Sequence, residues 1–297
     1  MSPHASHLTN PLATPTQLST SGSQLDGIPP DLERSIIFAG ARLTQTAGQL
    51  LRLPQDIIAR AIILFTRFWV GSEGGSLREY AAADISAAAL YLTSKLSPHP
   101  QQPRSIVNAY AYLDSFPTTF NPPSAFASHT NQESYFLSEA ACSASKLRLM
   151  QSEAIVLRVL GFNTHVATPY TLCINYLQAL DVFPGPRATA IARRAFAYLN
   201  AALLSPQLVY LTHQPHALAV AAIYLAAREG GVKLPDGEWW AVFDVEREEL
   251  GFLVVALRSL EGFVRGEREA WGGRRVPLSL GEVEAELERR GVLERVE

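Results

Sequence analysis

The sequence predicts an all-α protein made of two successive five-helix bundles, each with an alanine-rich helix at its centre. No segment of the 297 residues keeps the alternation of apolar and polar residues that a β-strand requires. From residue 31 onward the apolar residues recur with a helical period instead. Residues 79–96 (EYAAADISAAALYLTSKL) and 216–231 (HALAVAAIYLAAREGG) leave no polar face. A helix of that kind has to be surrounded by protein, which predicts two central helices.

The first bundle is expected to follow a disordered tail. Residues 1–30 are rich in Ser, Thr, Pro and Gln and poor in large apolar residues, which predicts disorder. The bundle itself is expected to cover residues 31–163. Residues 115–136 (SFPTTFNPPSAFASHTNQESYF) show no periodicity and are expected to form a loop insertion. Its five helices are predicted at residues 31–51, 53–70, 79–96, 102–113 and 137–162.

The second bundle is expected to cover residues 164–266 and to repeat the plan of the first. The segment AALYL at 88–92 matches AAIYL at 221–225, and Lys95 then corresponds to Arg228. Alanine lets neighbouring helices approach closely, which suits a central helix. The remaining residues, 267–297, are expected to form a charged tail. The helices of this bundle are predicted at residues 168–182, 186–204, 216–231, 237–243 and 245–264.

Composition and charge exclude several classes of protein. The formal net charge is −3 and the sequence pI about 6.2, which argues against direct binding to nucleic acid. Cys142 and Cys173 lie far apart without a C-x-x-C spacing, so both are expected to be core thiols. No apolar run reaches the roughly 18 residues of a membrane span, and the N-terminus has no signal-peptide pattern. We therefore expect an intracellular, soluble protein with no membrane partner.

The sequence carries no recognisable catalytic or metal-binding constellation. A phosphate-binding loop, a G-x-S-x-G elbow and an H-E-x-x-H helix are all missing. His213 and His216 form H-x-x-H around Pro215, but no third ligand accompanies them, so local capping is favoured over zinc binding. We expect no catalytic residues, no cofactor and no metal.

One residue breaks the pattern of the helix predicted at 137–162. At 100° per residue, Glu153 projects from the middle of an apolar face. An ionised carboxylate in that position is costly unless it is paired. Two interpretations stay open: Glu153 reaches water or pairs within the chain, or it lies at a surface that a partner covers. The apolar face consists of Leu149, Met150, Val156, Leu157 and Leu160, and Arg148, Gln151, Ser152 and Arg158 are expected outside it.

Five segments, taken in order, resemble one known family. They are TAGQLLRLPQ (46–55) followed by ILFTRFW (63–69), then AAALYLTSK (87–95), EAIVLRVLGFNTHVATPYTLCINYLQAL (153–180) and AIYLAAREGGVKLP (222–235). Their order and spacing resemble the cyclin family, in particular the cyclin L group, with the cyclin Q group as second choice. The resemblance covers about residues 31–265 and implies a tandem cyclin-box fold.

This resemblance implies a regulatory subunit and not an enzyme. The expected partner is a cyclin-dependent serine/threonine kinase acting in transcription by RNA polymerase II, in pre-mRNA splicing or in both, within a nuclear heterodimer. In cyclins the lysine that ends the third helix and a glutamate on the fifth contact the kinase, and the matching residues here are Lys95 and Glu153. Opposite charges at these positions can pair with each other and with backbone groups of the kinase.

The sequence also departs from the cyclin pattern. Leu96, Ser97 and Pro98 stand where cyclins often carry acidic residues, and RSIIFAGARLTQTAG (34–48) lacks the pattern with which cell-cycle cyclins capture substrate peptides. That docking groove is therefore not expected. The alternatives are a TFIIB-like general transcription factor, which would need a zinc ribbon and a basic face, and a cyclin-fold scaffold that does not activate a kinase. An all-α enzyme of the terpene synthase type would need a D-D-x-x-D motif, which does not occur.

Overall fold

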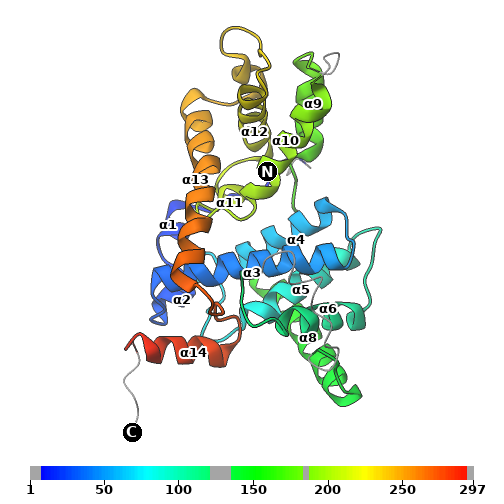
Figure 1. Cartoon of the computed structure of the whole chain (residues 1–297), viewed down its shortest axis with the longest axis vertical. Helices are drawn as coiled ribbons and strands as arrows, with labels where there is room; N and C mark the ends of the chain where they lie inside the picture. The colour runs from blue at the N-terminus through cyan, green and yellow to red at the C-terminus, as the bar shows by residue number, and fades with distance from the viewer. Residues whose placement is uncertain (1–7, 121–134, 183–186, 293–297) are drawn as a thin grey trace, which may run out of the picture. The chain divides into compact units, whose positions relative to one another are not determined.

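The chain folds into helices that form two compact units (Figure 1). The computed structural model describes residues 8–120, 135–182 and 187–292. Every regular element in these ranges is a helix, which confirms the predicted all-α class. The first unit consists of residues 14–164 together with 265–297, and the second unit consists of residues 1–13 together with 165–264. Each predicted bundle thus lies almost entirely in one unit, and each unit also takes up one end of the chain.

The first unit is built around one central helix, as predicted. Helix α5 (Ala82–Lys95) packs against all four of the other bundle helices. Its residues from Ile85 to Ser94 are all buried, because alanines and other small side chains let its neighbours approach from every side. Proline in the first turn fixes the start of both α3 and α6. The four surrounding helices are α3 (Pro30–Leu50), α4 (Gln55–Phe68), α6 (Pro103–Asp114) and α8 (Glu139–Val159).

The second unit repeats this arrangement around α12 (Pro215–Gly230). This helix has eleven buried residues and packs against α9, α10, α11 and the short 3-10 helix η2. Pro215 starts the helix, and Gly231 ends it in the left-handed conformation at φ +62°, which glycine adopts without strain. The other elements are α9 (Tyr170–Ala179), α10 (Ala188–Ala202), α11 (Val209–Thr212), η2 (Trp239–Phe243) and α13 (Arg247–Trp271).

The predicted disordered tail at residues 1–30 is wrong for the part that the structure describes. Residues 15–25 form two short helices, α1 (Pro15–Ser19) and α2 (Gly22–Leu25). The hydroxyl of Ser23 is fully buried and accepts a hydrogen bond from the backbone of Leu77. The side chain of Asn10 bonds both backbone groups of Ala167 in the second unit. Short polar side chains here form hydrogen bonds with backbone groups of the folded chain. The amino-acid composition of residues 1–30 does not reveal these bonds.

The predicted loop insertion and the predicted tail have different outcomes. Residues 115–120 and 135–136 of the insertion contain no helix, and residues 121–134 lie outside the described part of the chain. Residues 267–297 were expected to form a charged tail, but the described part, residues 267–292, extends α13 to Trp271 and then forms α14 (Leu280–Arg289). This segment buries Val276, Leu278, Val283 and Leu287, so it is an integral part of the first unit.

Close contact between α3 and α4 predicts a large difference between two glycine substitutions. A Cβ at Gly40 would lie 2.4 Å from Cζ of Phe65, whose side chain is fully buried, whereas a Cβ at Gly251 on α13 would meet nothing within 4 Å. We expect Gly40→Ala to lower the free energy of unfolding by about 1–3 kcal/mol through overpacking. Gly251→Ala should instead raise it by up to about 1 kcal/mol, because alanine favours the helix. Urea unfolding of the two variants checks both signs.

Candidate functional site

Lys95 is the last residue of the central helix α5, and the local sequence explains why it reaches the surface there. The hydroxyls of Thr93 and Ser94 turn back onto carbonyl groups of the preceding turn, so these polar residues stay buried without loss of hydrogen bonds. Leu96 caps the helix with its backbone N–H. The ammonium group therefore lies at the negative end of the helix dipole.

Glu153 comes from α8, which packs against α5. It lies on the same helix face as Leu149 and Val156, and only 8% of its surface is exposed. Its carboxylate oxygen Oε1 accepts a hydrogen bond of 2.7 Å from Nζ of Lys95. The internal pairing that the sequence left open is therefore present. The two charges still differ in exposure, because 51% of the Lys95 side chain is exposed and 11% of the Glu153 side chain.

The electrostatics of this pair favour the charged form of Lys95. The hydrogen bond from Lys95 to Glu153 raises the pKa of the ammonium group above its ordinary value, although burial opposes the shift. The ammonium group also lies 5.1 Å from the ring centroid of Tyr91, a cation–π contact. Lys95 has three N–H donors and uses one of them on Glu153. Two donors remain for the groups of a partner.

Apolar side chains next to the pair are exposed. Leu96 is 66% exposed, and Leu147 and Met150 on α8 are 59% and 49% exposed. Leu147, Met150 and Glu153 are spaced by three residues, so they follow one another along the helix surface. The prediction that Met150 belongs to the buried face is wrong, and so is the prediction that Ser152 lies outside it, since Ser152 is buried. Helix α8 packs against both α5 and α6, which shifts its buried face from the ideal helical projection.

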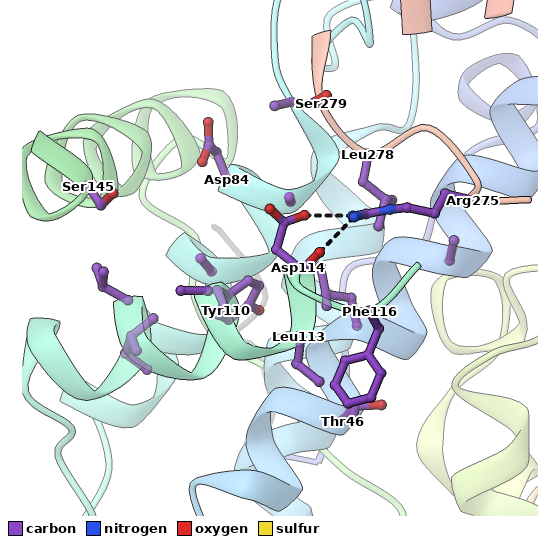
Figure 2. A pocket seen from close by; sticks show the side chains of 18 of the residues that line it. Thr46, Asp84, Tyr110, Leu113, Asp114, Phe116, Ser145, Arg275, Leu278 and Ser279 are labelled. Carbon is purple, nitrogen blue, oxygen red and sulfur yellow. Dashed lines mark hydrogen bonds and ion pairs between the residues drawn. The ribbon is translucent and has the colours of Figure 1, made fainter. Parts of the chain in front are cut away.

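A second feature of the first unit is a cavity of about 500 Å³ (Figure 2). Helices α3, α5, α6 and α8 form its walls together with residues of the C-terminal segment. Arg275 donates to the side chain of Asp114 at 2.6 Å and to its carbonyl oxygen at 2.7 Å. The backbone N–H of Ala83 donates to the carbonyl oxygen of Leu278 at 3.1 Å. The sequence did not reveal this cavity, because its walls come from segments more than 150 residues apart.

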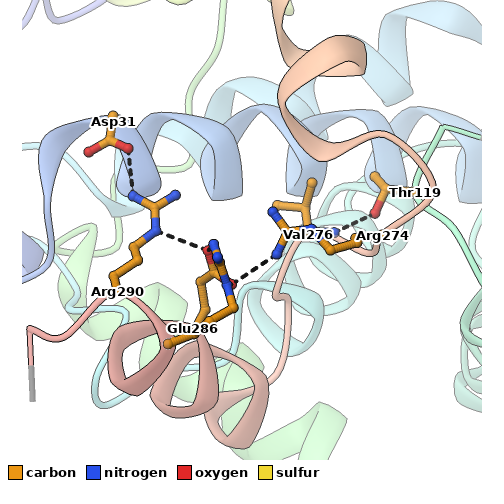
Figure 3. Close-up of polar contacts among 7 residues, drawn as sticks. Asp31, Thr119, Arg274, Val276, Glu286 and Arg290 are labelled. Atoms are coloured by element: carbon orange, nitrogen blue, oxygen red, sulfur yellow. Dashed lines mark hydrogen bonds and ion pairs between the residues drawn. The ribbon is translucent and has the colours of Figure 1, made fainter.

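A single buried carboxylate holds the C-terminal segment in place (Figure 3). Glu286 accepts hydrogen bonds from Arg289 at 2.7 and 2.5 Å, from Arg290 at 2.9 Å and from Arg274 at 3.3 Å. Arg290 also reaches Asp31 at the start of α3, at 2.6 Å. These bonds, first of all the one from Arg289, lower the pKa of Glu286 to about 2. The negative charge of Glu286 is therefore part of the folded structure.

This pKa predicts a loss of stability in acid. The pKa of Glu286 is about 2 in the folded chain and about 4.5 without its partners, so the unfolded chain binds the proton more readily. The stabilisation is complete above about pH 4.5 and is lost as the pH falls toward 2. We expect Glu286→Gln to lower the free energy of unfolding by on the order of 2 kcal/mol at neutral pH and by much less at about pH 3. Denaturant titrations at the two pH values check this, and an equal loss at both would contradict it.

The other candidate residues show structural roles. The His213 ring hydrogen-bonds Thr212, stacks on Phe252 at 5.2 Å, and has a pKa lowered by burial. Cys142 and Cys173 are free and buried, which confirms the prediction of core thiols, and burial raises the pKa of Cys173 to about 12. Within the described residues, no group of three or more His, Cys, Asp or Glu side chains could hold a metal ion. None of the described helices combines the length and the hydropathy that crossing a membrane requires.

Curated proteins resemble this chain over most of its length. Cyclin-L1 of Gallus gallus is 29% identical over 284 residues, which is 95% of this chain and 47% of that protein. Cyclin-L2 of Mus musculus is 30% identical over 244 residues, 82% of this chain and 43% of that protein. The chain thus spans less than half the length of these relatives. No protein-family model matches it.

Solved structures resemble it in fold. A chain of the yeast RNA Pol II CTD kinase CTDK-1 complex gives a TM-score of 0.65 at 12% identity, covering 96% of this chain and 84% of that one. A chain of the CAK complex of Chaetomium thermophilum bound to ATP-gamma-S gives 0.56 at 17% identity, covering 91% and 81%. These likenesses confirm the expected fold, which consists of two successive helical bundles.

Proposed function

We propose that this chain is a member of the cyclin family and the regulatory subunit of a cyclin-dependent serine/threonine kinase acting in transcription by RNA polymerase II, in pre-mRNA splicing or in both. The observation that carries the proposal is the likeness to Cyclin-L1 and Cyclin-L2 over as much as 95% of the chain. Under this proposal the two cyclin boxes are residues 31–163 and 164–266. The chain works in the nucleus as half of a heterodimer and performs no catalysis itself.

In this proposal, Lys95 and Glu153 are the residues that bind the kinase. Their charges are already paired at 2.7 Å, so the partner does not have to bring them together. Lys95 offers its remaining donors to carbonyl groups of the segment that leads into the kinase C-helix. As the partner covers the exposed Leu96 and Met150, water leaves and these charge-assisted hydrogen bonds strengthen.

Activation follows from a shift in the position of the kinase C-helix. A docked cyclin favours the inward position, in which the glutamate of the C-helix pairs with the lysine that holds ATP. The cyclin therefore contributes binding free energy that differs between the two positions of the helix. The chemical step takes place on the kinase alone.

Co-purification followed by a kinase assay tests the proposal. The tagged full chain is expressed in cells of its source, and co-purifying proteins are identified by mass spectrometry. We expect a cyclin-dependent kinase among them, and a rise in its activity toward an RNA polymerase II C-terminal repeat peptide when the purified chain is added. A kinase that binds without a rise in activity would favour the scaffold. Specific binding to promoter DNA without any kinase would favour the TFIIB-like alternative.

A further inference from the structure

Three arginines and three carboxylates line the cavity of the first unit, namely Arg42, Arg148, Arg275, Asp84, Asp114 and Glu282. Burial raises the pKa of Asp84 above its ordinary value, and the nearby charge of Arg148 opposes that shift. Arg275 is neutralised by Asp114, and Glu282 adds an ion pair at 3.7 Å. Arg42 also lines this cavity, and it has no carboxylate partner in the described part of the chain.

The environment of Arg42 is unusual for an unpaired cation. Its guanidinium carbon lies 4.8 Å from the ring centroid of Phe120 and 5.8 Å from that of Phe38. Its Nη1 atom is buried and makes no hydrogen bond within the described residues. Burial lowers the pKa of Arg42, and the neighbouring charge of Arg268 lowers it further. Arg42 as a whole is half-buried, and charges that are partly removed from water are normally paired, so its guanidinium can take an anion that no described carboxylate supplies.

We propose that Arg42 anchors a binding site for a carboxylate or phosphate carried on an apolar body, which occupies this cavity. A guanidinium that lies beside aromatic rings presents its N–H groups in one plane, a geometry that matches the oxygens of these anions. The volume of about 500 Å³ suits a ligand of small-molecule size or one side chain with its neighbours. The apolar part of the ligand would contact the hydrophobic lining, which consists of Leu43, Ile106, Val107, Leu113, Phe116 and Leu278.

Titration of small probes into the full chain tests this site. Phenyl phosphate and benzoate supply the anion on an apolar ring, benzyl alcohol supplies the ring without the charge, and inorganic phosphate supplies the charge without the ring. We expect phenyl phosphate or benzoate to bind at least about tenfold more tightly than benzyl alcohol and inorganic phosphate, as measured by calorimetry. Equal affinity for the charged and the neutral ring would overturn the proposal, and this comparison needs no variant.

A pair of arginine variants then assigns the site to Arg42. Arg42→Met should weaken the binding of the preferred probe by about tenfold or more, because it removes the charge and the donors. Arg104→Met is the matched control, since Arg104 is an exposed arginine of the same unit that does not line this cavity, and it should leave the affinity unchanged. The melting temperature of Arg42→Met should stay the same or rise, since the variant removes an unpaired, half-buried charge. An unchanged affinity in Arg42→Met would overturn the assignment.

A final comparison separates two sources of the anion. A short peptide with one phosphotyrosine between apolar residues is titrated beside phenyl phosphate. Tighter binding of the peptide assigns the site to a phosphorylated side chain of a partner, and equal binding assigns it to a free small molecule. Both results support the anion site. Because all of these measurements use the chain without a kinase, they are independent of the proposed kinase function.

Discussion

Reversing the charge of Lys95 or of Glu153 is expected to abolish kinase binding, and exchanging the two residues is expected to restore stability but not binding. Lys95→Glu alone leaves two carboxylates facing each other across a contact of 2.7 Å, one of them buried. The exchanged chain, with Lys95→Glu and Glu153→Lys, rebuilds an ion pair inside the fold. It still presents reversed charges to the kinase, so binding should stay weaker by at least about a hundredfold.

Two measurements on each variant separate the structural role from the functional one. Thermal unfolding reports the state of the fold, and surface plasmon resonance with the co-purified kinase reports binding. The control exchanges Lys233 and Asp236, an ion pair with side chains 79% and 85% exposed, and should change neither value. If the Lys95–Glu153 exchange restored full binding to the kinase, the pair would have only a structural role.

Ending the chain at Gly272 is expected to unfold much of the first unit. The missing segment would remove four buried aliphatic side chains, Val276, Leu278, Val283 and Leu287, together with the contacts of Glu286. Each such side chain contributes about 1.5–3 kcal/mol on burial. The total is comparable with the whole stability of a domain, about 5–15 kcal/mol. Circular dichroism and limited proteolysis of the shortened chain check the result.

A matched pair of substitutions on α14 gives the same information without deleting residues. Leu287 is completely buried, and Leu280 on the same helix is 37% exposed. We expect Leu287→Ser to cost about 2–5 kcal/mol of unfolding free energy, as large-to-small changes in a core do. Leu280→Ser should cost well under half of that. A shortened chain or a Leu287→Ser variant as stable as the original would contradict the assignment of this segment to the first unit.

The features predicted from the sequence are those with a strong local pattern. The central helices α5 and α12 were predictable because runs of alanine without a polar face have to be buried. Glu153 was noticed because helical periodicity places its charge in the middle of an apolar face. The resemblance to cyclins then connected it with Lys95. Their hydrogen bond confirms that the two residues meet, while their role in binding a kinase stays a prediction.

The features that were missed depend on contacts between distant residues. The charged composition of residues 267–297 predicted a tail. Nothing in the local sequence shows that Glu286 accepts hydrogen bonds from three arginines or that Arg290 forms an ion pair with Asp31. The same reason applies to the buried hydroxyl of Ser23 and to the unpaired guanidinium of Arg42. Polar residues take such positions only when a partner far along the chain completes them.

The bond between Arg290 and Asp31 joins residues 259 positions apart, and this separation has a consequence for synthesis on the ribosome. The chain emerges from its N-terminus, and domains generally fold as units while it grows. The second unit has all of its residues once Val264 has left the ribosome, whereas the first unit waits for residues 265–292. The bundle that begins earlier in the chain is therefore completed later. Until then its surface for α14 stays uncovered, so for a time the emerging chain carries one complete unit and one incomplete one.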